Sequence, residues 1–497
     1  MTPRGDTASE AGARTTHQAV VVRAPTRSSQ EHTASLKKPL SSWAFLGPAL
    51  LVSVGYMDPG NWATDLEGGA RFGYQLIWVL LASNLMALLL QNLSARLGVV
   101  TGRDLASACR AEYSRPLSFT LWVLAELGII ACDLAEVLGS AVALHLLFGI
   151  PTLTGALLTS VDVLVILMLQ QRGMRRLEAV VLVLLVSIGA CMLVELCLAQ
   201  PSLAGIASGL RPHLTGESLY VAIGILGATV MPHNLYLHSA LVPRVSPGDR
   251  RAALRRNLWS TAIALNLALL VNLAILIVAA AVFWSRELPV DDIRDAYRLL
   301  TPLLGSGVAS VLFAIGLLCA GQSATVSGTL AGQIVMDGFV QLRVHPVLRR
   351  AVTRGVALIP AVGVLAWVGD AGLMSLLVGS QVVLSLQLPF AVIPLIKLTS
   401  SRALMGEYAN GAVARWSASA CAALIVLANG ALVARTVSLH WNTLPWLAAL
   451  LAVTGAMSLL LLIRVAIVTL RSDQRASLSR DTNQPPHGSD IGRRAAL

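Results

Sequence analysis

The sequence predicts an all-α polytopic membrane protein with about twelve transmembrane helices. Hydrophobic residues make up 55% of the 497 residues and charged residues only 13%, and the mean hydropathy is +0.71. A soluble globular protein has about a quarter of its residues charged and cannot bury so much apolar surface. The apolar residues also fall into runs near the ~20 residues that a helix needs to cross a bilayer.

We expect the spans at residues 43–70, 75–97, 117–148, 153–169, 178–198, 218–242, 258–283, 305–333, 351–368, 373–395, 414–433 and 445–470. Their boundaries are the least certain part of the prediction. Residues 1–40 are rich in Ser, Thr, Arg and Ala and lack the apolar core of a secretory signal. We expect them, and the polar residues 471–497, to be disordered cytoplasmic tails.

Basic residues collect on the same side as the N-terminus, for example Arg96, Arg103 and Arg110 at and after the end of the second span. Such loops face the cytoplasm, so both termini are expected inside. The net charge of +11 is therefore no signal for nucleic acid. We expect the lipid bilayer to be the surroundings of the chain and infer no obligate protein partner.

The first span contains Asp58-Pro59-Gly60-Asn61. Pro59 lacks an N–H group and Gly60 has no side chain to stiffen the backbone, so a continuous helix is not expected here. An ionised Asp at mid-bilayer depth costs roughly 2.5 to 3.5 kcal/mol on insertion scales. Irregular backbone is tolerated there only inside protein or beside a wet cavity. The motif predicts a cation site, although a kinked helix with a structural Asp is the other interpretation.

The sixth span is interrupted in the same way by Met231-Pro232-His233-Asn234. Two Pro-interrupted hydrophobic segments at corresponding positions of two halves indicate a transporter binding site. We therefore expect a first repeat over residues 41–200, an inverted second repeat over 216–398 and accessory helices over 411–470. This inverted five-plus-five arrangement is typical of the LeuT-type fold.

The donors near the two breaks favour a transition metal. Asp58 and Asn61 offer oxygen atoms, and Met231 offers a thioether that Mg²⁺ and Ca²⁺ do not use. The Ala228 carbonyl is the expected backbone ligand because Pro232, four residues on, cannot donate to it. Gln381 and Asn272 are buried amides, which act as ligands, gate contacts or helix–helix hydrogen bonds.

Ionisable residues inside spans usually mark an ion or proton path. Asp133 and Glu136 share one helix face and follow Glu126 in the third span. His233, beside Pro232, is either a packing residue or a proton carrier. Three arginines open the ninth span and either anchor it at the membrane surface or end a proton route, namely Arg349, Arg350 and Arg354.

The two motifs together resemble the Nramp family of proton-coupled divalent metal transporters. The resemblance extends to residues 131–140 (ACDLAEVLGS), 320–338 (AGQSATVSGTLAGQIVMDG) and 380–390 (SQVVLSLQLPF). It covers roughly residues 47–397 and looks most like the bacterial manganese-uptake branch. The resemblance therefore implies a cell membrane protein, in the bacterial inner membrane.

The resemblance implies inward symport of Mn²⁺ or Fe²⁺ with H⁺, with no permanently bound cofactor. It implies metal ligation by Asp58, Asn61, Met231, the Ala228 carbonyl and, in some conformations, Gln381. It also implies a proton route whose members are Asp133, Glu136, His233, Glu126 and the arginines of the ninth span. Glu67 stands near the outer vestibule where Gln is expected, and its added charge either attracts cations, alters the gate or has no effect.

Two other functions remain open from the residues. A carrier of an organic substrate could use the same breaks, although Asp58 would repel a carboxylate. A metal-responsive receptor that binds without transporting would need damaged ligands or gates, and none is evident in the sequence. An enzyme is not expected, because the sequence shows no nucleophile–base set, P-loop or dinucleotide motif.

Overall fold

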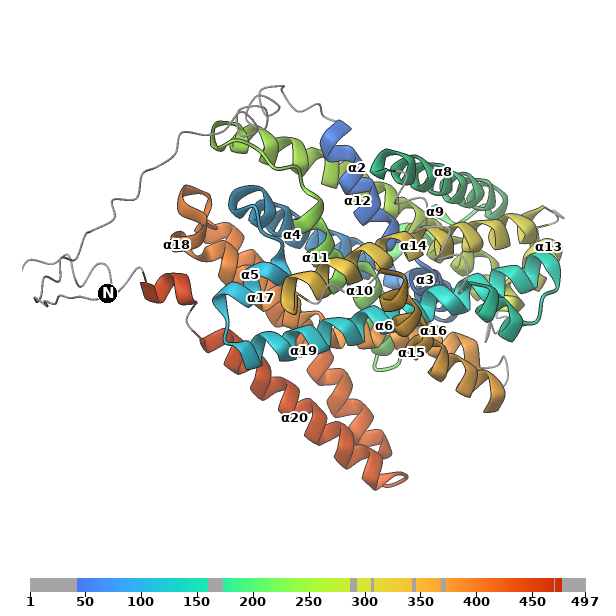
Figure 1. Cartoon of the computed structure of the whole chain (residues 1–497). Helices are drawn as coiled ribbons and strands as arrows, with labels where there is room; N and C mark the ends of the chain where they lie inside the picture. Colours follow the sequence, from blue (N-terminus) through green and yellow to red (C-terminus); the bar gives the residue numbers. More distant parts are fainter. Residues whose placement is uncertain are drawn as a thin grey trace, which may run out of the picture. The chain divides into compact units, whose positions relative to one another are not determined.

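The computed structural model describes residues 43–159, 173–286, 293–304, 308–341, 346–367, 372–468 and 470–475. All regular secondary structure within these ranges is helical (Figure 1). Nine helical segments in the described part of the chain are long and apolar enough to cross a membrane. These observations confirm the all-α polytopic prediction. The expected tails, residues 1–40 and most of 471–497, lie outside the described residues.

The first predicted span consists of two helices, α2 (Trp43–Gly55) and α3 (Pro59–Phe72). Asp58 caps α3, and Pro59 occupies its first turn, where a missing N–H costs nothing. The sixth span is divided in the same way into α10 (Ser218–Thr229) and α11 (Pro232–Leu241), with Pro232 in the first turn of α11. Both predicted breaks are confirmed.

The other long helices follow the predicted spans with shifted ends. They are α4 (Ile77–Thr101), α6 (Arg115–Phe148), α8 (Met174–Ala199), α12 (Arg250–Val282), α14 (Ala309–Phe339), α15 (Pro346–Trp367), α19 (Ala412–His440) and α20 (Pro445–Ile467). Residues 152–159 are helical as well, and the rest of that predicted span, 160–169, lies outside the described residues. The tenth span is two helices, α16 (Leu373–Gln387) and α17 (Pro389–Ser400), which meet at Leu388.

Shorter helices occupy loops for which no helix was predicted. They are α5 (Leu105–Glu112), α9 (Leu203–Ser208), α13 (Ile293–Leu304) and α18 (Arg402–Met405). Helix α13 lies in the charged loop between the predicted spans 258–283 and 305–333. Its amphipathic pattern mixes charged and apolar residues, so hydropathy alone does not reveal it.

The core of the bundle includes the helix pairs α6 with α14, α3 with α12, and α10 with α16. Small residues let these helices approach closely, as is common between membrane helices. A methyl group built on Gly227 of α10 would lie 2.8 Å from the backbone nitrogen of Ser385 in α16. Helices α19 and α20, at the lower edge of Figure 1, pack on each other and on α17.

Candidate metal site between two broken helices

Asp58 stands at the start of α3 with one oxygen engaged and one not. Its Oδ1 accepts from the Asn61 backbone N–H at 2.8 Å and from Asn61 Nδ2 at 2.7 Å. Its Oδ2 is buried and has no hydrogen-bond partner in the described structure. A buried carboxylate oxygen without a donor is costly unless a proton or cation satisfies it.

Asn61 links α3 to two other helices. Its Nδ2 also donates to the Ala228 carbonyl at 3.1 Å, which Pro232 cannot reach as a donor. Its Oδ1 accepts from Asn272 Nδ2 in α12 at 3.2 Å. Asn272 Nδ2 further donates to the Tyr56 carbonyl at 2.8 Å, in the break between α2 and α3. The side chain of Asn61 therefore turns its amide nitrogen, not its oxygen, toward Asp58 and Ala228.

Met231 forms the N-cap position of α11 and is fully buried. Its sulfur accepts from Asn234 Nδ2 at 3.6 Å, and the same nitrogen donates to the Val52 carbonyl at 3.4 Å. Asn234 thus holds the start of α11 against α2. This contact places the break in the sixth span next to the break in the first span.

Gln381 reaches the site from α16. A methyl group built on Gly60 would collide with its Nε2, so α16 lies directly against the turn that follows Asp58. Gln381 Nε2 donates to Ser380 Oγ at 2.9 Å, whereas its Oε1 is buried without a hydrogen-bond donor among the described residues. The predicted ligands Asp58, Asn61, Ala228 and Gln381 therefore come together.

The described ranges contain no group of three or more His, Cys, Asp or Glu side chains placed to hold a metal ion. The cluster around Asp58 offers other donors: one carboxylate, two amides and one carbonyl, and Met231 at the start of α11 adds a thioether. Such a set of mostly oxygen donors with a single sulfur suits Mn²⁺ or Fe²⁺ better than the hard cations.

The predicted proton-route residues of α6 lie on its contact with α14. A methyl group on Gly328 would lie 2.7 Å from Glu136 Oε1 and 3.6 Å from Asp133 Oδ1. Cys132 Sγ lies 3.6 Å from Glu136 Oε1 and 3.8 Å from His233 Nε2. This thiol connects α6 with α11, a role that sequence reasoning missed because Cys132 looked like an ordinary buried cysteine.

Arg349 pairs with Glu126 across α15 and α6. Its Nη2 lies 3.1 Å from Glu126 Oε1, and the two side chains are 6% and 15% exposed. Trp122 Nε1 donates to the same carboxylate at 3.2 Å. The side chains of Arg350 and Arg354 lie outside what the structure describes.

Glu67 forms an ion pair with Arg71 on the same helix at 2.7 Å. Arg71 is half exposed, and its positive charge offsets the negative charge of Glu67. Glu67 is therefore not a free carboxylate in the structure.

A second buried polar chain was missed. Gln91 Nε2 donates to Tyr56 Oη at 2.8 Å, and Gln91 Oε1 lies 2.9 Å from His238 Nδ1. His238 Nε2 lies 3.3 Å from Asn257 Oδ1, and Asn257 donates to Thr261. The sequence signal that could have revealed this chain is the presence of polar residues, such as Gln91 and His238, within apolar spans.

Asp65 and Glu195 were missed as well. Both are buried carboxylates in spans, and in the described part of the chain neither Asp65 oxygen has a hydrogen-bond partner. Asp65 lies seven residues after Asp58 on the same side of α3.

Two broken helices that face each other in a bundle of apolar spans, with unengaged oxygen atoms between them, define a membrane carrier of the LeuT type. A family model described as "Natural resistance-associated macrophage protein-like" (Nramp) matches residues 49–435. The chain belongs to the Nramp family, whose members are transporters and not enzymes.

Curated relatives agree. The divalent metal cation transporter MntH of Xanthomonas campestris is 56% identical over 373 residues, which cover 73% of this chain and 84% of the relative. The MntH of Bradyrhizobium diazoefficiens is 52% identical over 426 residues, covering 83% and 95%. A natural resistance-associated macrophage protein 2 homolog of Dictyostelium discoideum is 53% identical over 382 residues, covering 76% of this chain and 60% of the relative.

Solved structures support the fold. The Eremococcus coleocola manganese transporter, in complex with an aromatic bis-isothiourea substituted compound, has a TM-score of 0.78 at 36% identity and covers 90% of this chain and 96% of its own. Mhp1, a nucleobase-cation-symport-1 family transporter, has a TM-score of 0.56 at 16% identity, covering 88% and 93%. The second match shows the fold alone.

Proposed function

We propose that the chain imports divalent transition metal ions, Mn²⁺ and Fe²⁺, together with protons by alternating access. One observation carries the proposal: the unpartnered Oδ2 of buried Asp58 lies in the break of the first span, where Asn61, Ala228 and Gln381 converge. Relatives that are more than half identical bear the name divalent metal cation transporter.

In this proposal the metal is bound by Asp58, Asn61, Met231, the Ala228 carbonyl and Gln381. The Oδ2 of Asp58 and the Oε1 of Gln381 are available without rearrangement. Asn61 must turn its amide over to present its oxygen, and this releases the Ala228 carbonyl from Nδ2. The thioether of Met231 provides selectivity against Mg²⁺ and Ca²⁺.

In this proposal, proton coupling arises from the positive charge of the metal ion. A dication at Asp58 favours the ionised carboxylate, so an arriving metal displaces a proton from Asp58. Asp133 and Glu136 receive it on the side of α6 that faces α14, with Cys132 and His233 between the two regions. The ion pair of Arg349 and Glu126 ends this route in the N-terminal half of α6.

We place the protein in the cell membrane with both termini in the cytoplasm. The excess of Arg in the loops after the even-numbered spans supports this orientation. A cysteine introduced at the exposed Arg475 of a Cys197→Ser variant should be protected from impermeant maleimide in intact cells. Labelling of this cysteine from outside would contradict the orientation.

The test is uptake by the full chain in proteoliposomes, with Mn²⁺ outside and a pH indicator inside. We expect saturable Mn²⁺ entry with acidification, lost in Asp58→Ala and retained in Asp337→Ala, an exposed carboxylate on α14. Met231→Ala should gain Ca²⁺ or Mg²⁺ transport, whereas Met192→Ala, another buried methionine, should not.

Two results would contradict the proposal. Wild-type protein that binds Mn²⁺ without uptake would favour a metal-responsive receptor. Folded wild-type protein without affinity for any divalent metal would favour a carrier of an organic substrate.

A further inference from the structure

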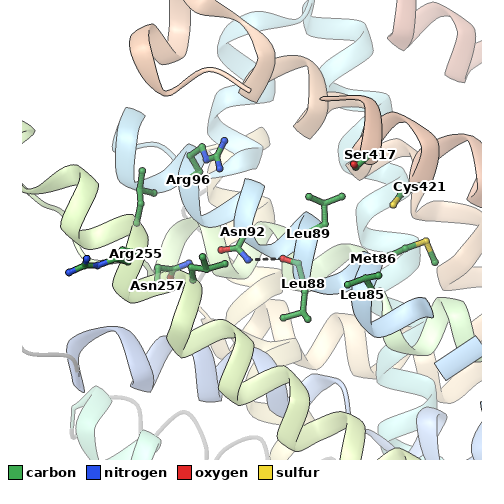
Figure 2. A pocket seen from close by; sticks show the side chains of 12 residues that line it. Leu85, Met86, Leu88, Leu89, Asn92, Arg96, Arg255, Asn257, Ser417 and Cys421 are labelled. Atoms are coloured by element: carbon green, nitrogen blue, oxygen red, sulfur yellow. Dashed lines mark hydrogen bonds between the residues drawn. The ribbon is translucent and has the colours of Figure 1, made fainter. Parts of the chain in front are cut away.

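A groove runs along the outside of the bundle, and none of the candidate metal-site residues lines it. It has a volume of about 700 Å³ and lies between α4, α12 and α19 (Figure 2). Five of the twelve residues that line it are leucines: Leu85, Leu88 and Leu89 from α4, and Leu254 and Leu258 from α12. Leu85 is 70% exposed and Leu258 is 47% exposed, so the groove opens toward the surroundings of the bundle and not into its core.

One end of the groove is basic. Arg96 of α4 and Arg255 of α12 lie at this end, while Leu85 and Met86 lie at the other (Figure 2). Arg96 donates to the neutral Asn410 side chain, at 3.2 Å. Arg255 is exposed, and no ion pair of either arginine occurs in the described ranges. Neither arginine is therefore neutralised there by a carboxylate.

A second cavity of about 340 Å³ adjoins this end and shares Arg96 and Leu254 with the groove. It is polar and includes Arg251 and Glu407. These two form an ion pair at 2.8 Å, and the hydrogen bond from Arg251 holds the pKa of Glu407 below its usual value. The carboxylate is thus already engaged, and the two cavities together carry an excess of positive charge.

The length of the groove fits one leaflet of a bilayer. From Leu85 to Arg96 the α4 axis rises about 16 Å, at ~1.5 Å per residue. This is about half of the ~30 Å hydrocarbon thickness. The apolar wall therefore matches the depth of an acyl chain, and the arginines lie at the level of its headgroup.

We propose that this groove binds an anionic phospholipid, with the phosphate at Arg96 and Arg255 and an acyl chain along the leucines of α4. Guanidinium groups bind phosphate oxygens in a bidentate geometry that Lys cannot reproduce. Basic pockets between membrane helices on the cytoplasmic side are suited to such headgroups. A zwitterionic lipid carries the same phosphate, but its ammonium group adds a positive charge beside the two arginines, so a lipid with net negative charge is favoured.

The test measures lipid retained by the full chain in native mass spectrometry. The purified protein is offered equal amounts of phosphatidylglycerol and phosphatidylcholine with identical acyl chains. We expect wild type to retain one phosphatidylglycerol in preference to phosphatidylcholine by roughly tenfold or more. The double variant Arg96→Gln, Arg255→Gln should lose this preference.

The matched control is Arg244→Gln with Arg415→Gln. It removes the same charge from two arginines that do not line the groove, and it should retain the lipid. A second variant, Ser417→Trp, fills the groove from the exposed face of α19 without touching an arginine. It should lose the lipid as the double variant does.

Equal retention of the two lipids by wild type would overturn the proposal. So would loss of the preference in the Arg244 and Arg415 control, because charge anywhere on the surface would then suffice. A wild-type dimer that Ser417→Trp separates, without retained phosphatidylglycerol, would assign the groove to a second copy of the chain instead.

Discussion

Asn61 and Asp58 are joined by two hydrogen bonds, both from Asn61 to the same carboxylate oxygen. The backbone N–H fixes the start of α3. The side-chain Nδ2 donates to the same oxygen at 2.7 Å, so the amide nitrogen of Asn61, and not its oxygen, lies beside the carboxylate. Metal ligation by Asn61 therefore requires a rotation of its amide. Asn272 now donates to Asn61 Oδ1. The rotation would break this hydrogen bond, because it would turn the Asn61 oxygen away from Asn272.

Asn272→Leu should weaken metal binding, because Asn272 positions both Asn61 and the Tyr56 carbonyl. Removal of a residue that orients a metal ligand typically lowers the affinity for the metal by about 10- to 100-fold. We expect KM for Mn²⁺ in proteoliposome uptake to rise within this range, with a smaller change in kcat. Asn266→Leu, on the exposed side of the same helix, is the control, and an equal rise in both variants would argue against a positioning role.

Asp133→Asn should separate metal transport from proton transport. The change removes a proton acceptor from α6 but leaves the donors around Asp58 in place. Internal acidification per Mn²⁺ ion transported should fall, while Mn²⁺ binding persists. Asp337→Asn, which changes an exposed carboxylate of α14, should keep the wild-type ratio. Proton uptake by Asp133→Asn equal to that of wild type would show that the assigned route is wrong.

The sequence allowed prediction of the two breaks, because Pro59 and Pro232 act locally on the backbone. It could not reveal which way the Asn61 amide points, since that depends on Asn272 of α12, more than 200 residues away. The choice of Arg349 as the partner of Glu126 likewise depends on how α15 lies on α6. The helix α13 was missed because its apolar residues are too few to resemble a span.

Removing only one partner of the ion pair between Arg349 and Glu126 should lower the stability of the protein strongly. Both side chains are largely buried, so Glu126→Ala leaves an uncompensated guanidinium and is expected to cost about 3 to 5 kcal/mol of stability. The double variant Glu126→Leu, Arg349→Met should be more stable than Glu126→Ala, because no unpaired charge remains. Thermal unfolding of the purified protein in detergent measures both, and a double variant less stable than the single would contradict the argument.

Gly139→Ala should disturb the start of α3. The added methyl group would overlap the ring of Pro59, and overpacking of this kind typically costs about 1 to 3 kcal/mol. We expect a lower unfolding temperature and slower Mn²⁺ uptake. Gly189→Ala is the control, because nothing lies within 4 Å of the added group. An unchanged Gly139→Ala variant would mean that α3 and α6 are not in close contact.

The contact between Pro59 and Gly139 also has a mechanical consequence. Helix α3 begins with its proline ring against the backbone of α6, three residues beyond Glu136. The start of α3 cannot tilt toward α6 without pushing that helix. A rotation of α3 as the carrier opens or closes would therefore displace the segment of α6 that contains Asp133 and Glu136. The movements of metal and protons would then be coupled through this one contact.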